Sequence, residues 1–362
     1  MELLNLDCQG HSIRLEGSMA GWQMLYWNNT PVSRLDATAN FNGESLHEFE
    51  LQAGDGEVLR LRLAVDLQWQ PFSLQYSLFI NDEAVVTGER NTRDVERQVP
   101  SQPLAPAKKQ FSLVGLAALG FKLLKSAKLI KVGLAGASLT AYAWFFSLPF
   151  ALALIACLVV HEYGHIRAMK YFGMKTKGIY LIPFLGGLAL SDEKINTRWQ
   201  DVVISLMGPC FGLLLSVLSL LAYWLTGEVF FAGLSAFNAL LNLFNLLPIL
   251  PLDGGHVLKS ITFSMNSIVG LVLCAVAAIG GVFLSYSLGL ALLGFLLIIG
   301  SIEIFMEWRG RHHSHLLPLD RYGQLFSTVW YLVTVGGLIA IIWYCSSMGD
   351  ALLGLPLKIL QS

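Results

Sequence analysis

Long stretches without a charged side chain constrain this chain more than any other feature. Residues 132–160 carry no charge, and similar runs cover about 202–225, 229–250, 267–286, 288–306 and 325–345, interrupted only by Glu303. A spanning helix needs about 20 mostly apolar residues. Only 14% of the residues are charged, against about 25% in soluble domains. The sequence therefore predicts a polytopic α-helical membrane protein with about six to seven spans.

Residues 1–98 have a different pattern. Apolar and polar side chains alternate over 59–65 and 72–80, which is typical of half-buried strands. Asn28-Asn29 and Asn81-Asp82 lie between such runs and predict hairpin turns. We expect a soluble all-β, β-sandwich-like head. It contains no catalytic motif, which suggests a regulatory partner-binding role. The isolated histidines His11 and His47 are expected at its surface.

The segment 99–131 reads as a linker followed by a helix. Pro100, Pro103 and Pro106 break regular structure, and lysines then recur on one helical face at 122, 125, 128 and 131. This pattern predicts an amphipathic helix lying on the bilayer surface. A soluble amphipathic helix packed on the head is the alternative.

Positive charge predicts the orientation of the first spans. The apolar stretch divides near Pro149 into spans at about 133–147 and 149–172, and lysines lie on the outer side of both. The positive-inside rule then puts both of these ends in the cytoplasm. The first residues do not resemble a signal peptide, so we expect a cytoplasmic N-terminus in a bacterial inner membrane. The helices beyond residue 260 would be additional C-terminal spans.

A zinc-binding motif lies at the end of the second predicted span. His161 and His165 are four residues apart, so on a helix both imidazoles can reach one Zn²⁺ ion. Glu162 beside the first histidine can act as general base. No Cys-x-x-Cys pair occurs among the five cysteines, so neither a thiolate zinc site nor a disulfide framework is supported.

A catalytic zinc site needs a third protein ligand. Asp253 is the strongest candidate, because it follows an apolar span and precedes Gly254 and Gly255. His256, three residues later, is the competitor. Glu303 is better explained by an ion pair, and the histidines at 312, 313 and 315 by a solvated loop.

An apolar segment at 177–190 follows the second span and contains Pro183 and Gly186-Gly187. These breakers predict a short hairpin rather than a span. Its edge could bind an extended substrate by strand addition, or it could be a plain surface hairpin.

These motifs resemble the site-2 protease family of intramembrane zinc metalloproteases. The resemblance is carried by residues 161–165 and 245–255, with Gly208-Pro209 and 183–187 also similar. It covers about 133–260, so residues 132–260 would form a zinc metalloprotease membrane core.

The resemblance implies a role for each site residue. His161, His165 and Asp253 would bind zinc, Glu162 would activate water, and Asn245 would hold substrate or the oxyanion. If helical, Asn245 lies about two turns before Asp253. The substrate would be a transmembrane protein cleaved within or near its membrane segment.

Other function classes remain open. A non-proteolytic membrane zinc protein, either a transporter or a regulatory pseudoprotease, would share the ligands but not the chemistry. A different membrane metalloprotease class would take its third ligand from a glutamate in a later helix. The net charge of −1 gives no indication of nucleic-acid binding.

Overall fold

The structure is a computed structural model of the whole chain. It describes residues 1–8, 10–19, 21–36, 42–52, 58–98, 128–145, 147–182, 186–191, 194–287, 291–309 and 316–348. The predicted linker and most of the surface helix, residues 99–127, lie outside the described residues, as do the histidines at 312, 313 and 315. The predicted division into four domains therefore stays a prediction.

The N-terminal region consists of two antiparallel four-stranded sheets, which confirms the all-β expectation. The strands are β1 (Glu2–Cys8), β2 (His11–Gly17), β3 (Gln23–Trp27), β4 (Thr30–Leu35), β5 (Gly43–Gln52), β6 (Val58–Trp69), β7 (Phe72–Ile80) and β8 (Glu83–Asn91). One cluster of buried side chains draws on both sheets, including Leu15 and Leu25 from the first and Leu63 and Leu74 from the second. Burying the apolar face of each sheet against the other is what holds such a pair together.

The two predicted hairpin turns are present. Asn28 and Asn29 have φ of 45° and 68°, and Asn81 and Asp82 have φ of 49° and 67°. Two consecutive residues with positive φ are the signature of the tight turn that matches the twist of paired strands. Asn and Asp tolerate this conformation better than other side chains.

The expectation that His47 lies on the surface is wrong. His47 is 0% exposed on β5. Its Nδ1 lies 3.0 Å from Ser33 Oγ, and its Nε2 lies 3.1 Å from Gln23 Oε1. The alternating pattern of β5 was not strong enough to show which face this strand buries. Burial lowers the pKa of His47 to about 4, because the charged form loses its hydration.

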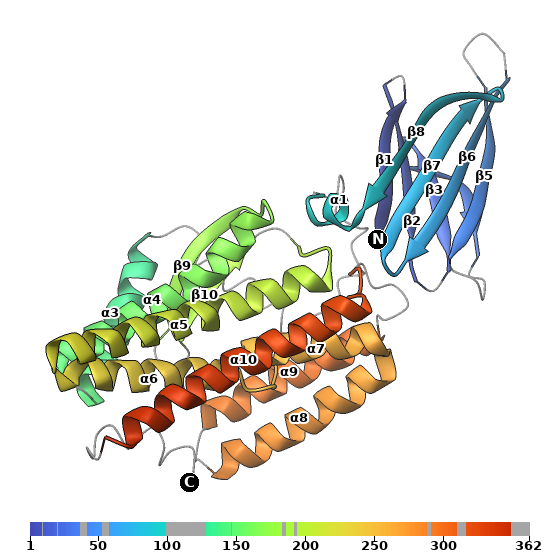
Figure 1. Cartoon of the computed structure of the whole chain (residues 1–362). Coiled ribbons are helices and arrows are strands. Elements are labelled where there is room, and N and C mark those ends of the chain that lie inside the picture. The colour runs from blue at the N-terminus through green and yellow to red at the C-terminus, as the bar shows by residue number, and fades with distance from the viewer. Residues whose placement is uncertain are drawn as a thin grey trace.

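The head is attached to the membrane region by direct contacts. Figure 1 shows the head at one end of the helices, with α1 (Thr92–Glu96) at the junction. Asn196 Nδ2 donates to the carbonyl oxygens of Val95 and Gln98, at 3.1 and 2.7 Å. Leu317 is buried in the hydrophobic core of the head. The head is thus held at the helix ends rather than only tethered by a linker.

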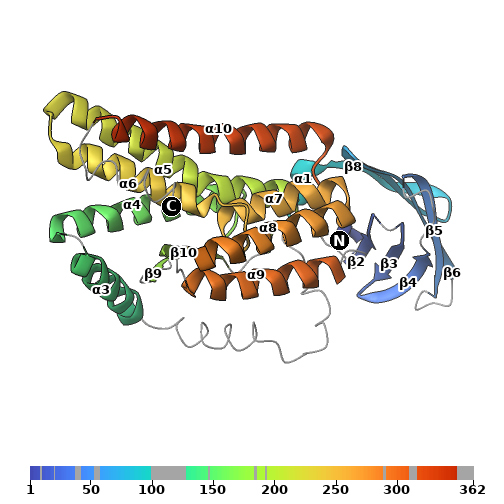
Figure 2. The same ribbon diagram turned by 90° about the horizontal axis from the view of Figure 1, so that it is seen from below.

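The rest of the described chain is helical apart from one hairpin, and Figure 2 shows most of its helices running side by side. The helices are α3 (Lys128–Phe145), α4 (Leu148–Tyr171), α5 (Arg198–Thr226), α6 (Val229–Asn245), α7 (Asp253–Met265), α8 (Ser267–Ser287), α9 (Ala291–Arg309) and α10 (Arg321–Ser346). The division near Pro149 is confirmed, since proline occupies the first turn of α4, where its missing N–H is not needed. Helix α7 was not predicted.

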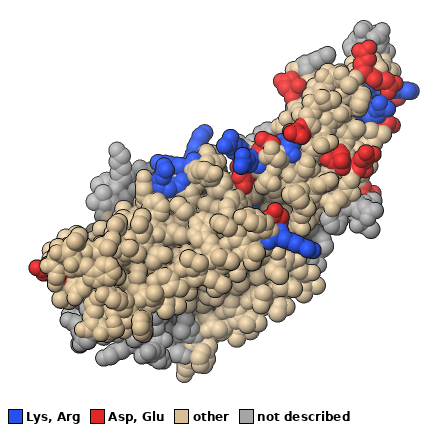
Figure 3. All heavy atoms as spheres, viewed as in Figure 1, with Lys and Arg blue, Asp and Glu red and all other residues tan. Residues whose placement is uncertain are grey.

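Within the described part of the chain, three helices are long and apolar enough to cross a membrane: α4, α5 and α10. Helix α6 and the Ile268–Phe283 part of α8 are apolar but shorter. The predicted count of six to seven spans is therefore not confirmed. On the face shown in Figure 3, charged side chains gather on the head and near its junction with the helices, while most of the helical surface on that face lacks them. Such a surface is compatible with a membrane location.

The predicted hairpin after α4 is present. β9 (Thr176–Ile182) pairs antiparallel with β10 (Gly186–Ser191), and its turn at 183–185 lies outside the described residues. Both strands contact α4, the helix that carries the zinc-binding motif.

Candidate metal centre

Helix α4 brings the two predicted histidine ligands together. His161 and His165 are 3% and 7% exposed, and their Nε2 atoms are 3.0 Å apart. The i, i+4 spacing stacks the two side chains on one helical face, as the sequence predicted. This face points into the protein, where a metal would be shielded from bulk water.

Asp253 reaches the same point from the first residue of α7. Its Oδ2 lies 3.3 Å from His161 Nε2 and 3.5 Å from His165 Nε2. The ligand atoms of these three residues lie within 4.8 Å of one another, and no other such group of His, Cys, Asp or Glu occurs among the described residues. The structure thus brings together the three ligands proposed from the sequence.

Asp253 reaches the two histidines because the chain is not helical between α6 and α7. Helix α6 ends at Asn245, and the non-helical segment 246–252 leads to α7. A side chain at Gly254 would collide with the carbonyl of Leu246, so only glycine lets the chain turn back this closely. Pro248 and Pro251 lie in this non-helical segment, and the new helix that starts at Asp253 was not predicted.

Glycines also set the approach of α4 to α5. A side chain at Gly164 would collide with the backbone of Met207, and one at Gly208 would collide with the His165 ring. Small residues at a helix contact let the backbones approach closely. The glycine inside the zinc-binding motif therefore has a packing role.

The hydrogen bonds of the two imidazoles determine which nitrogens face one another. His161 Nδ1 lies 2.7 Å from Asn242 Oδ1, and His165 Nδ1 lies 2.7 Å from the carbonyl oxygen of Ile204. Both partners are acceptors, so each Nδ1 carries the proton and each Nε2 of a neutral ring presents a lone pair. The carboxylate oxygen Oδ2 of Asp253 is buried without a hydrogen-bond partner among the described residues.

This arrangement fits a zinc ion. Two lone pairs and a carboxylate oxygen converge in a buried place, where they repel unless a cation lies between them. Tetrahedral zinc with bonds of about 2.0–2.2 Å holds its ligand atoms roughly 3.3–3.6 Å apart. The three separations here, 3.0, 3.3 and 3.5 Å, are close to that range.

Glu162 lies beside this centre without joining it. Its side chain is buried, with Oε1 4.0 Å from His161 Nε2 and a hydrogen bond to the backbone of Ala189 in β10. A general base must stand next to the water that it deprotonates, not replace it on the metal. The position of Glu162 suits that role.

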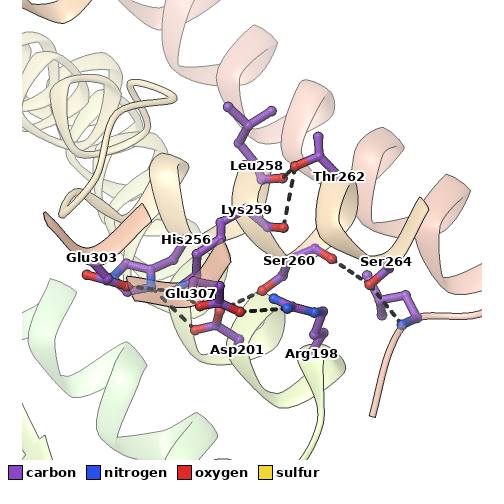
Figure 4. Close-up of polar contacts among 11 residues, drawn as sticks. Arg198, Asp201, His256, Leu258, Lys259, Ser260, Thr262, Ser264, Glu303 and Glu307 are labelled. Carbon is purple, nitrogen blue, oxygen red and sulfur yellow. Dashed lines mark hydrogen bonds and ion pairs between the residues drawn. The ribbon is translucent and has the colours of Figure 1, made fainter. Parts of the chain in front are cut away.

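His256, the competing ligand, points elsewhere. Its Nδ1 lies 3.5 Å from Asp201 Oδ1, within the group of polar residues drawn in Figure 4. Asp201 also accepts a hydrogen bond of 2.6 Å from Ser260 Oγ. In the described structure His256 is therefore a partner of α5.

Glu303, as expected, makes an ion pair. Its partner is the buried Lys259. Lys259 is 5% exposed, and its Nζ lies 2.6 Å from Glu303 Oε1 and 3.6 Å from Glu307 Oε2. Glu307 in turn accepts a 2.6 Å hydrogen bond from Arg198 (Figure 4). Lys259 is therefore a buried cation that two acids of α9 neutralise.

Asn242, rather than Asn245, contacts the predicted ligands. Asn245 is the last residue of α6 and half-buried, and its side chain makes no hydrogen bond within the described part of the chain. It does not lie two helical turns before Asp253, since the helix ends there. Asn242, which bonds His161, was missed. The signal was available: two asparagines four apart, at 238 and 242, in an otherwise apolar helix.

Comparisons with known proteins agree with these motifs. Residues 149–232 match the profile described as Peptidase family M50. This segment contains His161, Glu162 and His165 and ends before Asp253.

Three relatives from different organisms are similar to part of the chain. The chain is 35% identical over 173 residues to the protein named "Putative zinc metalloprotease" in Synechocystis sp., which covers 46% of this chain and 45% of that protein. It is 26% identical over 188 residues to stage IV sporulation protein FB of Bacillus subtilis, covering 47% and 63%. It is 30% identical over 138 residues to a zinc metalloprotease of Methanocaldococcus jannaschii, covering 37% and 40%.

The aligned part spans less than two thirds of each of these relatives. The family match itself covers neither the head nor the helices after residue 232. What the comparison does establish concerns the part that carries the zinc-binding motif. Residues 149–232 match the peptidase family M50, which confirms the resemblance of this chain to the site-2 proteases.

Proposed function

We propose that this protein is an intramembrane zinc metalloprotease that cleaves a peptide bond within or near a transmembrane segment of another membrane protein. The observation that carries the proposal is the convergence of His161, His165 and Asp253 within 4.8 Å, with Glu162 beside them. One zinc ion held by these three ligands keeps a fourth position open, as catalytic zinc sites require.

Each residue has a chemical task in this proposal. When bound, zinc supplies Lewis acidity to a water molecule and to the scissile carbonyl. Glu162 takes the proton from that water and passes it to the leaving amine. Asn245 stands at the end of α6, near the start of the segment that leads to Asp253, and would orient the substrate or donate to the oxyanion.

The remaining assignments follow from this role. The substrate is a transmembrane protein that must unwind locally, because a helix hides its peptide groups. The protein would reside in a bacterial inner membrane with its N-terminus in the cytoplasm. The head would bind a regulatory partner, and the membrane core would comprise residues 132–260 with additional helices after it.

Replacing Glu162 with Gln tests the proposal. The variant keeps the ligands but has no base, so we expect unchanged zinc content and a rate roughly 10²–10⁴-fold lower. Zinc is measured by mass spectrometry of the purified protein. Cleavage is measured by comparing new protein termini in membranes that contain the wild type or the variant.

Two outcomes contradict the proposal. If the wild type produces no new termini but binds zinc, the protein is a pseudoprotease or transporter. If Glu162→Gln cleaves as the wild type does, Glu162 is not the base.

A further inference from the structure

Helix α6 buries a row of polar side chains that the proposed reaction does not use. Ser235, Asn238 and Asn242 are each 0% exposed, and they recur at a spacing of three and four residues along one helical face. Burying an amide without hydrogen bonds costs several kcal/mol by the usual scales. Each of these side chains is therefore expected to have hydrogen-bond partners inside the protein.

Asn242 has a fully determined orientation. Its Nδ2 donates to the carbonyl oxygen of Asn238 at 2.8 Å and to Asn238 Oδ1 at 3.0 Å. Because a backbone carbonyl can only accept, the nitrogen of this amide must face Asn238. The oxygen is left facing His161 Nδ1 at 2.7 Å.

Asn238 is held in turn by α5. Its Nδ2 donates to the carbonyl oxygen of Gly212 at 2.8 Å and to Ser216 Oγ at 2.7 Å. Ser235 Oγ donates to the carbonyl oxygen of Ser216 at 2.7 Å. The row thus connects the backbone of α5, through two asparagines, to the ring of His161.

Gly212 provides the space for this connection. A Cβ atom built at this position would overlap the side-chain amide of Asn242. Any larger residue would have to displace the group that bonds His161. Gly212 itself is on α5 and carries no ligand atom.

We propose that Asn242 is a positioning residue for His161, and that Asn238 and Gly212 hold Asn242 in place. The bond from Nδ1–H to Asn242 Oδ1 selects the ring tautomer whose Nε2 lone pair faces His165 and Asp253. The His165 ring is oriented in the same way by a hydrogen bond from its Nδ1 to the backbone carbonyl of Ile204. Only the His161 side therefore depends on a replaceable side chain. This inference rests on the zinc site proposed above.

The test compares Asn242→Leu with Asn242→Asp in the full-length protein in detergent micelles. Leucine is close in size but makes no hydrogen bond. The protonated form of aspartic acid keeps an acceptor towards His161 and a donor towards Asn238. Zinc affinity is measured by competition with a chromophoric chelator. We expect about 10–100-fold weaker binding for Asn242→Leu and affinity nearer to wild type for Asn242→Asp.

Cobalt gives a readout that a merely structural role would not change. Co²⁺ replaces zinc in tetrahedral sites, and its visible absorption depends on the ligand geometry. We expect an altered band for Asn242→Leu at saturating Co²⁺ and restoration in Asn242→Asp. Thermal unfolding of the metal-free variants verifies that they fold.

Matched controls separate positioning from general loss of packing. Thr334→Val removes a hydroxyl that is 2% exposed and bonds the Trp330 carbonyl and Cys210 Sγ rather than a predicted zinc ligand, so zinc affinity should not change. Gly212→Ala should weaken zinc binding as Asn242→Leu does. Gly336→Ala should not, because an added Cβ there meets no atom within 4 Å among the described residues.

The outcomes distinguish this inference from the proposed function. If the wild type binds no zinc, both the proposed function and the positioning role of Asn242 are wrong. If the wild type binds zinc and folded Asn242→Leu binds it as tightly with an unchanged cobalt band, the positioning role alone is wrong.

Discussion

His47 in the head and His161 in the helical region are both buried, but their ring nitrogens have different partners. In the head, both ring nitrogens of His47 face protein groups, Ser33 Oγ and Gln23 Oε1. In the helical region, His161 Nδ1 bonds Asn242 Oδ1, while its Nε2 faces His165 Nε2 and Asp253 Oδ2. Two protein partners account for a buried histidine structurally, whereas a ring nitrogen that faces other lone pairs suits a metal ligand. Because His47 is isolated in the sequence, no pattern indicated whether it has a structural role or binds a metal.

Removing Asp253 should produce the largest effect. Asp253→Ala deletes a ligand rather than a supporting group, so zinc affinity should fall by more than the roughly 10–100-fold typical of an outer partner. His256→Ala is the matched control, because its imidazole pairs with Asp201 and should leave zinc binding unchanged. Bound zinc in the purified proteins is the measurement. Loss of zinc from His256→Ala, with retention in Asp253→Ala, would reverse the ligand assignment.

Breaking the buried ion pairs of the core should affect stability but not zinc. Arg198 and Glu307 side chains are 5% and 17% exposed, so Glu307→Gln leaves buried charge unpaired and should destabilise by about 3–5 kcal/mol. In the head, Arg60 and Glu50 side chains are 78% and 60% exposed, and Glu50→Gln should change stability by less than about 1 kcal/mol. Unfolding in micelles, with and without a chelator, measures both. Equal effects would show that burial does not distinguish these pairs.

The smallest effect concerns pH and the head. His47 has a pKa of about 4 when folded and 6.5 when unfolded, so the unfolded state binds more protons between these values. The resulting loss of stability is absent above pH 6.5 and grows as the pH falls towards 4, to roughly 3 kcal/mol.

Calorimetry of the full-length protein at pH 7 and 5 tests this. Glutamine keeps polar groups at this position but does not titrate, so the transition of the head in His47→Gln should depend less on pH than in the wild type. The prediction fails if both proteins respond to pH equally, since His47 would then not be the titrating group.

Much of the fold could be predicted, because its strongest determinants are local. Uncharged runs indicated the helical region, Pro149 divided two helices, and Asn-Asn and Asn-Asp pairs indicated hairpin turns. Where prediction failed, the missing information was long-range. Helix α7 was missed because its sequence, with buried Lys259 and several polar residues, looks like a loop until α5 and α9 supply the partners.

The sequence by itself determined the residue types of the candidate site. Two histidines and a glutamate at helical spacing, followed by an aspartate after an apolar span, are residue types that suit zinc hydrolysis. Only the tertiary structure decided which of Asp253 and His256 faces the histidines, and that Asn242 rather than Asn245 bonds the first of them. Spacing along a helix follows from backbone geometry. Contacts between helices depend on how closely glycines such as Gly208 and Gly212 let them approach, which no local pattern contains.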